Sequence, residues 1–166
     1  MSEMEISLKY GSHLPILTKV VNLTNGPILE LGMGLYSTPF LHFTCYSTKR
    51  KLVSFERDPE WFRNFDDCAS DFHEINLIKS WDKLPVDNYY DVAFIDQSPG
   101  RHRPLTAVKL ANFAKYIILH DTEPEFDKYY GYSRIYHLFK YRFDYQETFP
   151  HTSIVSNFID LSNFKI

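Results

Sequence analysis

Apolar residues recur along the chain at two spacings, and the two spacings alternate. Short apolar runs rich in β-branched and aromatic residues predict strands, and stretches with an apolar residue every three or four positions predict helices. The predicted strands cover residues 28–31, 51–55, 73–78, 90–95 and 116–119, with a closing pair over 143–148 and 152–161. The predicted helices cover residues 14–23, 36–46, 59–72, 104–113 and 126–141. Strands that alternate with helices favour an α/β fold, in which helices cover both faces of a mostly parallel sheet.

The turn after the first predicted strand carries the first candidate chemistry. In PILELGMGLYST, residues 27–38, Gly32 and Gly34 interrupt the apolar run directly before a predicted helix. A strand, a glycine turn and a helix together place a ligand against the backbone N–H groups at the helix N-terminus. Ligands of open α/β sheets bind at the carboxyl ends of the strands. This turn is therefore the predicted binding site.

An acid at the end of the second predicted strand narrows the choice of ligand. Glu56 follows Gly32 by about two dozen residues, a spacing at which a carboxylate accepts the hydroxyls of an adenosine ribose. Such a contact serves NAD and S-adenosylmethionine equally. The pattern has Ser37 where dinucleotide sites have a third glycine, and Glu30 precedes Gly32 by two residues. Because Glu30 would repel a pyrophosphate but suits the ammonium group of a methionine moiety, the pattern favours S-adenosylmethionine.

The turn resembles the first motif of class I S-adenosylmethionine-dependent methyltransferases, because its residues form the arrangement E-x-G-x-G. The resemblance covers roughly residues 27–123. It implies a Rossmann-like, doubly wound, mostly parallel seven-stranded sheet with helices on both faces and an antiparallel last strand. It also implies an adenine contact after the third strand, where the Trp81 indole either covers the base or packs at the sheet edge. The implied cofactor-binding residues are Glu30, Gly32, Gly34, Ser37, Glu56, Ser80, Trp81 and Asp96.

Two acids end neighbouring predicted strands. Asp96 follows the run YDVAFI, and Asp121 follows YIILH. Two carboxylates at adjacent strand ends can share a divalent cation (Mg²⁺ or Mn²⁺), which prefers oxygen ligands and lowers the pKa of a bound hydroxyl. This layout resembles the small metal-dependent O-methyltransferases of the catechol type. Those enzymes have a lysine base shortly after the fourth strand, whereas this chain has Gln97-Ser98-Pro99 there.

His120 is the alternative base. It directly precedes Asp121, which can orient the ring and raise its basicity. As a catalytic set, Asp96, His120 and Asp121 resemble the sugar O-methyltransferases, some of which also bind a divalent ion. A histidine bonded to the backbone at a sheet edge is the structural alternative. The N-methyltransferase signature D/N-P-P-Y is absent after the fourth strand, so a hydroxyl is the expected methyl acceptor.

Three further segments carry polar or aromatic residues that can reach these strand ends. Arg101, His102 and Arg103 follow Gly100 and form either a solvated loop or a substrate contact, with Arg101 suited to phosphate or carboxylate. Trp61 belongs to the predicted helix over 59–72 and is expected in its core or on its surface. The segment over residues 10–13 precedes the first helix and is expected to fold over the cofactor.

The composition limits the classes of protein to which the chain can belong. The chain has 166 residues, of which 44% are hydrophobic, and this suffices for one core. Its net charge of −3 argues against a nucleic-acid substrate. Cys45 and Cys68 lack CxxC spacing and are expected to be reduced core residues. No apolar run approaches the roughly 20 residues of a membrane span, and the polar start MSEMEIS differs from a signal peptide, so a cytoplasmic protein is expected.

The chain is expected to form a single methyltransferase domain. Its parts are an N-terminal helical segment (1–26), a cofactor-binding core (27–123) and a C-terminal helix with closing strands (124–166). The absence of a long insertion implies an open cleft, which suits a sugar, a glycan or a small hydroxylated metabolite. Alternatively, a homodimer partner completes the cleft. Two other functions are a non-catalytic S-adenosylmethionine- or nucleotide-binding module and an NAD-dependent oxidoreductase. The latter lacks its third glycine and a suitably placed Tyr-x-x-x-Lys pair.

Overall fold

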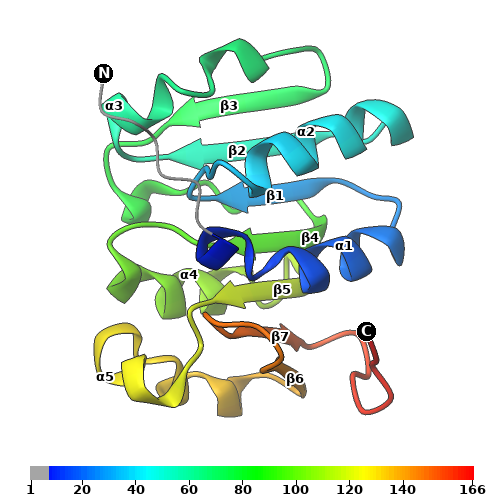
Figure 1. Cartoon of the computed structure of the whole chain (residues 1–166), viewed down its shortest axis with the longest axis vertical. Coiled ribbons are helices and arrows are strands. Elements are labelled where there is room, and N and C mark those ends of the chain that lie inside the picture. The colour runs from blue at the N-terminus through cyan, green and yellow to red at the C-terminus, as the bar shows by residue number, and fades with distance from the viewer. Residues whose placement is uncertain (1–7) are drawn as a thin grey trace.

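The computed structural model describes residues 8–166 as a seven-stranded sheet with helices on both faces (Figure 1). In chain order the strands are β1 (Ile28–Leu31), β2 (Leu52–Glu56), β3 (His73–Leu77), β4 (Tyr90–Ile95), β5 (Ala114–His120), β6 (Tyr141–Tyr145) and β7 (Thr152–Ser156). Their order across the sheet is β3-β2-β1-β4-β5-β7-β6. Strands β1 to β5 pair in parallel, and β7 runs antiparallel to both β5 and β6. The predicted α/β fold with an antiparallel last strand is confirmed.

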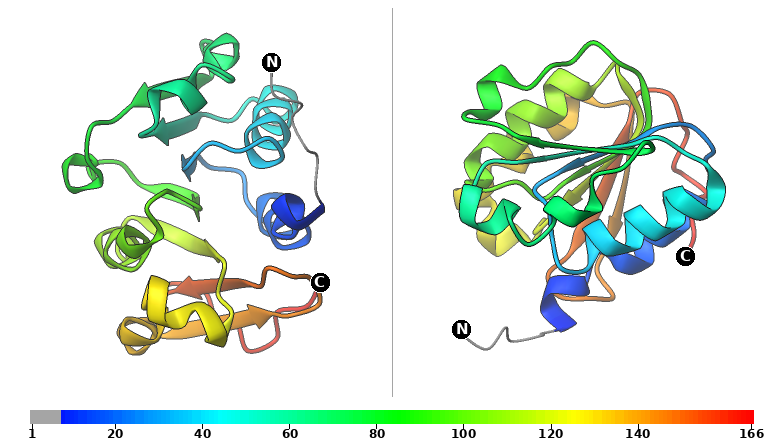
Figure 2. Two further views of the ribbon diagram at one scale, coloured as in Figure 1. Left: turned by 60° about the vertical axis from the view of Figure 1, so that its left-hand side comes forward. Right: turned by 90° about the horizontal axis from the view of Figure 1, so that it is seen from above.

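The helices form a layer on each side of the sheet. The α-helices are α1 (Leu14–Asn22), α2 (Ser37–Thr48), α3 (Pro59–Phe62), α4 (Arg103–Leu110) and α5 (Asp127–Tyr130). Short 3₁₀ helices cover Leu8–Gly11, Asp66–Cys68, Trp81–Lys83, Gly100–His102, Pro124–Phe126, Tyr132–Arg134 and Tyr136–Leu138. Helices α1 and α2 lie on one face, and α4 lies on the other (Figure 2). Within residues 8–166, no helix is long and apolar enough to cross a membrane.

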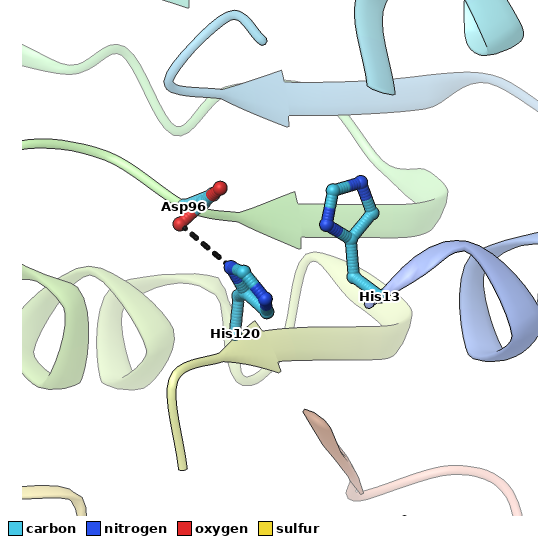
Figure 3. A group of neighbouring side chains, drawn as sticks. All are labelled: His13, Asp96 and His120. Carbon is cyan, nitrogen blue, oxygen red and sulfur yellow. Dashed lines mark ion pairs between the residues drawn. The ribbon is translucent and has the colours of Figure 1, made fainter. Parts of the chain in front are cut away.

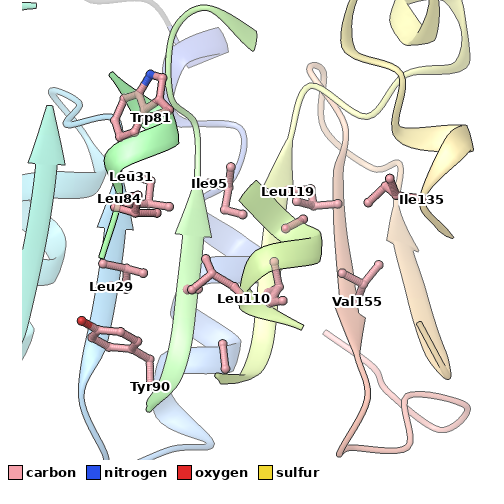
Figure 4. Packing of buried hydrophobic residues seen from close by; sticks show 14 of the residues in the cluster. Leu29, Leu31, Trp81, Leu84, Tyr90, Ile95, Leu110, Leu119, Ile135 and Val155 are labelled. Carbon is pink, nitrogen blue, oxygen red and sulfur yellow. The ribbon is translucent and has the colours of Figure 1, made fainter. Parts of the chain in front are cut away.

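Two apolar cores enclose the central strands, because successive residues of a strand point to opposite faces. In β1, Leu29 and Leu31 pack toward α4 and its Leu110, in the core that Figure 4 shows. Ile28 packs on the other side, with Leu17 of α1. All four residues of β1 are buried. The turn that follows β1 therefore emerges at a fixed place on the carboxyl edge of the sheet.

Two predicted helices are much shorter in the structure. Asp58 caps α3 by accepting from the N–H groups of Glu60 and Trp61, but no residue of α3 is buried, so no packed face extends the helix toward residue 72. In the helix predicted over 126–141, Gly131 adopts a left-handed conformation (φ 79°) and ends α5 after one turn. Cys45 is buried and free, as expected, whereas the free Cys68 is only half-buried, on a 3₁₀ helix.

Candidate active site

The glycine turn packs directly against the end of β4. Gly32 has a φ of 86°, and a Cβ built on it would lie 2.6 Å from the backbone oxygen of Asp96. Only glycine meets both conditions without displacing the neighbouring strand. Met33 donates its N–H to Glu56 Oε2 at 3.0 Å, and Gly34 donates to Thr38 Oγ1 at 2.9 Å. The turn after β1 thus contacts the ends of β2 and β4.

Glu30 lies beneath this turn, with no exposed surface. Its Oε1 accepts from Thr38 Oγ1 at 2.9 Å and its Oε2 accepts from Ser54 Oγ at 2.6 Å. Ser54 Oγ also lies 2.8 Å from His73 Nε2, and His73 Nδ1 lies 3.0 Å from His42 Nδ1. Burial raises the pKa of Glu30 to about 7, against the lowering effect of the hydroxyl contacts. We call these five residues the Glu30 cluster. Glu30 is enclosed beneath the turn, and its contact with the ammonium group stays a prediction.

Glu56 ends β2 beside the turn and is 5% exposed. Besides Met33, it accepts from the N–H groups of Arg57 (2.6 Å) and Asp58 (2.9 Å) through Oε1. All of these donors are backbone groups of the turn and of the loop after β2. The position agrees with the sequence analysis, and the contact to a ribose stays a prediction.

The two tryptophans lie in different environments. Trp81 is 2% exposed, packs in the core on the α4 side and donates its Nε1–H to Ser98 O at 2.8 Å. Its ring therefore has no free face for an adenine, which favours the packing alternative over the adenine contact. Ser80 instead caps the following 3₁₀ helix. Trp61 is 36% exposed, donates its Nε1–H to Met33 O at 2.7 Å and lines a cleft beside the turn.

This cleft, of about 780 Å³, connects the glycine turn with the ends of β4 and β5. Its lining includes Gly34, Trp61, Asp96, Arg103, His120 and Asp121. Ser37, the remaining predicted cofactor residue, is buried at the start of α2, and its Oγ has no hydrogen-bond partner among residues 8–166. A larger hollow of about 870 Å³ lies between β6 and the C-terminal residues, where none of the predicted site residues lies. The cleft is the place where the predicted binding and catalytic residues meet.

A buried arginine lies between the two strand-end acids. Arg103 Nη2 is 2.9 Å from Asp96 Oδ1, and its Nη1 is 2.8 Å from Asp121 Oδ2. The guanidinium also donates to the backbone oxygens of Gln97 and His120. It occupies the position in which Asp96 and Asp121 were predicted to share Mg²⁺, so this pair does not fit a shared ion. The sequence left Arg101, His102 and Arg103 as either a solvated loop or a substrate contact, and among these three only Arg101 is exposed.

His120 is held at both ring nitrogens. Its Nε2 lies 2.8 Å from Ser12 Oγ, and its Nδ1 lies 3.2 Å from Asp96 Oδ1 and 3.7 Å from Asp121 Oδ1. Burial lowers the pKa of His120, but the two carboxylates outweigh it and raise the pKa above its ordinary value. Burial opposes ionisation of Asp96 too, yet His120 and Arg103 bring the pKa of its carboxyl well below the usual range. The site therefore holds an ionised Asp96 beside an imidazole.

His13 is a cleft residue that sequence reasoning missed, although its segment was expected near the cofactor. It is 2% exposed, and its ring centroid lies 4.7 Å from that of Phe94 and 4.9 Å from that of His120. Neither ring nitrogen has a hydrogen-bond partner among residues 8–166. Burial, followed by repulsion from His120, lowers the pKa of His13 to about 4, so its ring is neutral near pH 7.

Comparison with known proteins yields a fold but no sequence family. No protein-family model matches the chain, and no curated protein matches it. Solved structures do match it. The O-methyltransferase TomG from Streptomyces achromogenes, in complex with S-adenosylmethionine, superposes with a TM-score of 0.64 at 14% identity, over 94% of this chain and 82% of that one.

Two further structures give the same result. The O-methyltransferase from Bacillus cereus, in complex with S-adenosylhomocysteine, has a TM-score of 0.64 at 16% identity, over 93% of this chain and 83% of that one. The S-adenosylhomocysteine-bound methyltransferase PaMTH1 from Podospora anserina has a TM-score of 0.66 at 12% identity, over 92% and 79%. The chain thus has the fold of class I S-adenosylmethionine-dependent methyltransferases, and small O-methyltransferases are frequent among its structural matches.

Proposed function

We propose that the chain is an S-adenosylmethionine-dependent O-methyltransferase that acts on a hydroxyl of a sugar, a glycan or a small hydroxylated metabolite. One observation carries the proposal: a single cleft joins Gly34, on the turn after β1, to Asp96 and His120 at the ends of β4 and β5. A donor bound at the turn would therefore lie beside groups that can handle a proton. The matched structures in complex with S-adenosylmethionine or S-adenosylhomocysteine support the choice of donor.

The lining of the cleft fits this donor. A Cβ built on Gly34 would meet only the Ser37 hydroxyl, at 3.0 Å, so the turn leaves its backbone open toward the cleft. Trp61 offers a partly exposed aromatic ring on the same wall, suited to stacking. Asp96 and Asp121 place two carboxylates on the lining, which also carries Lys9 and Arg103. When bound, S-adenosylmethionine supplies an electrophilic methyl group on its sulfonium.

Side chains at the ends of β4 and β5 would receive the proton that the acceptor hydroxyl loses. An alkyl hydroxyl has a pKa far above 7, so its proton must leave as the new bond forms. Ser12 and Asp96 fix the His120 ring from both sides, and Arg103 in turn holds Asp96. An acceptor hydroxyl bound at this end of the cleft would pass its proton to the His120–Asp96 pair.

The walls of the cleft favour an acceptor with a ring. Tyr10 is 63% exposed and Trp61 is 36% exposed, and both line the cleft. Aromatic faces of this kind pack well against the apolar face of a sugar or against a planar ring. This supports a sugar hydroxyl as the acceptor over a linear aliphatic one.

A turnover assay with a panel of acceptors tests the proposal. The full chain is incubated with S-adenosylmethionine and with free sugars, glycans, catechols or amines, while S-adenosylhomocysteine release and acceptor mass are measured. We expect release that depends on a hydroxylated acceptor, with a mass gain of one methylene group. Methylation of amines alone would contradict the O-directed assignment. Hydride transfer with NAD and no S-adenosylhomocysteine release would favour the oxidoreductase instead.

A further inference from the structure

Two buried ring nitrogens in the cleft, both of His13, have no hydrogen-bond partner among residues 8–166. The neighbouring His120 Nδ1 forms an ion pair with Asp96 Oδ1 at 3.2 Å. Buried polar atoms are nearly always paired, and groups that are not paired often mark the place of an absent ion or ligand. Because the rings of His13 and His120 are adjacent and line one cleft, a single ion can contact both of them.

The three candidate ligands come from separate parts of the chain. His13 precedes α1, Asp96 follows β4, and His120 ends β5 (Figure 3). One donor atom from each lies within 4.8 Å of the donor atoms of the other two. His120 Nδ1 and Asp96 Oδ1 are 3.2 Å apart. Bonds of about 2.0–2.2 Å to a tetrahedral ion set neighbouring donor atoms roughly 3.4 Å apart, so this pair already has the spacing of two ligands.

We propose that His13, Asp96 and His120 bind a divalent transition-metal cation of the Zn²⁺ class. Two imidazole nitrogens and one carboxylate oxygen form a donor set that Zn²⁺ and related cations accept, whereas Mg²⁺ prefers oxygen ligands alone. The site differs from the Mg²⁺ site that the sequence predicted, because His13 takes the place of Asp121. Asp121 instead pairs with Arg103, beside the site.

The surroundings of the three residues are suited to hold such an ion. A metal-bound histidine usually donates its other ring N–H to an acceptor, which fixes its orientation. Ser12 Oγ, 2.8 Å from His120 Nε2, is placed to accept that hydrogen, leaving the Nδ1 lone pair for the ion. Asp96 and Asp121 supply two negative charges beside the site, against the one positive charge of Arg103.

The catalytic role of this metal site rests on the proposed function, but metal binding itself does not. The three ligands line the same cleft as Gly34, so an acceptor hydroxyl that reaches the ion would have its pKa lowered there. With the ion bound, His120 would act as a ligand, and the ion would take over the activation of the hydroxyl.

Metal binding by the full chain, freed of metal with EDTA and dialysed, tests the inference. Calorimetric titration with Zn²⁺ and with Mg²⁺ gives stoichiometry and affinity, and the visible absorption of Co²⁺ reports the ligand geometry. We expect one equivalent of Zn²⁺ bound more tightly than Mg²⁺. We also expect a four- or five-coordinate Co²⁺ spectrum, which Zn²⁺ abolishes. Equal, weak binding of both metals would overturn the inference.

Variants locate the ion. His13→Ala and the shape-preserving Asp96→Asn should each weaken Zn²⁺ binding by at least the roughly 10- to 100-fold seen on loss of an outer-shell partner. His42→Ala is the matched control, because it removes a histidine from the Glu30 cluster, and it should leave the affinity unchanged. Loss of binding in His42→Ala with retention in the other two would contradict the inference.

Titration of the same metal-free protein with S-adenosylhomocysteine separates this inference from the proposed function. If S-adenosylhomocysteine binds but Zn²⁺ does not, only the metal site is wrong. If Zn²⁺ binds but S-adenosylhomocysteine does not, only the proposed function fails.

Discussion

Two buried clusters of the molecule combine a carboxylate with histidine rings, and they differ in whether their polar atoms are paired. In the Glu30 cluster, a chain of contacts of 2.6–3.0 Å connects Glu30 through Ser54 and His73 to His42. At the ends of β4 and β5, His13 and His120 lie beside Asp96, and both ring nitrogens of His13 are unpaired. The first cluster is complete without a ligand, and the second is not.

The difference separates a structural role from a functional one. A closed set of hydrogen bonds beneath a turn holds that turn in place, because removing any member leaves a buried group unpaired. Unpaired polar groups in a cleft can bind a ligand, because they gain hydrogen-bond partners only when the ligand arrives. Histidine and carboxylate side chains therefore do not mark a site by themselves. Their unpaired atoms and their position at a cleft do.

The sharpest contrast is expected in turnover. Removing the imidazole of His120 takes away either the proton acceptor or a metal ligand, so His120→Ala should lower the rate by roughly 10²–10⁴-fold. Its counterpart His42→Ala alters only the half-buried end of the Glu30 cluster and should change the rate little. Steady-state release of S-adenosylhomocysteine with an accepted hydroxyl substrate measures both. Equal losses in the two variants would remove the distinction between the clusters.

Stability should depend strongly on Arg103 and weakly on Arg101. Arg103→Met removes a buried guanidinium that pairs with the partly buried Asp96 and Asp121, and breaking a buried ion pair costs roughly 3–5 kcal/mol of unfolding free energy. Arg101→Met changes an exposed side chain of the same loop and should stay within about 0.5 kcal/mol. Urea denaturation of the two variants and the wild type gives these values. A small effect for Arg103→Met would mean that water replaces the guanidinium without cost.

The Glu30 cluster should produce a pH dependence of stability. The pKa of Glu30 rises from 4.5 to about 7 on folding, so between these values the folded protein holds a proton that the unfolded chain lacks. The stabilisation is therefore complete below pH 4.5 and is lost as the pH rises to about 7, amounting to roughly 3 kcal/mol.

Glu30→Gln isolates this effect. The amide resembles the protonated carboxyl and does not titrate, so the stability of the variant should rise relative to the wild type between pH 4.5 and 7. Comparing the two curves cancels the opposite trend of His73, whose pKa burial lowers to about 4. If the unfolding free energies of the variant and the wild type change in parallel between pH 4.5 and 7, Glu30 ionises at its ordinary pKa.

The fold could be read from the sequence where local pattern and tertiary packing agree. The strands over 28–31 and 90–95 were predicted at their observed bounds, because both are short apolar runs buried on each face. The helix over 126–141 was wrong because one residue, Gly131, ends α5 in a left-handed conformation. An apolar spacing cannot reveal which glycine adopts that conformation.

The sequence predicted the site residues at the strand ends, but not the residues that contact them. Glycine spacing and strand-end acids placed Gly34, Asp96 and His120 at one edge, and the structure brings them into one cleft. Arg103 looked like part of a solvated loop, since only the packing of α4 against the sheet turns it between two acids. His13 is distant in sequence from the strand ends, and no local pattern connects it with His120.

A calorimetric titration with S-adenosylhomocysteine and with NAD tests most directly the claim that the cleft beside the glycine turn is a methyltransferase site. The account predicts one equivalent of S-adenosylhomocysteine and a rise in melting temperature, with about 2.7 kcal/mol of added stability at 100 times the dissociation constant. NAD should give no heat of binding and no rise. Stoichiometric binding of NAD, with no response to S-adenosylhomocysteine, would contradict the account.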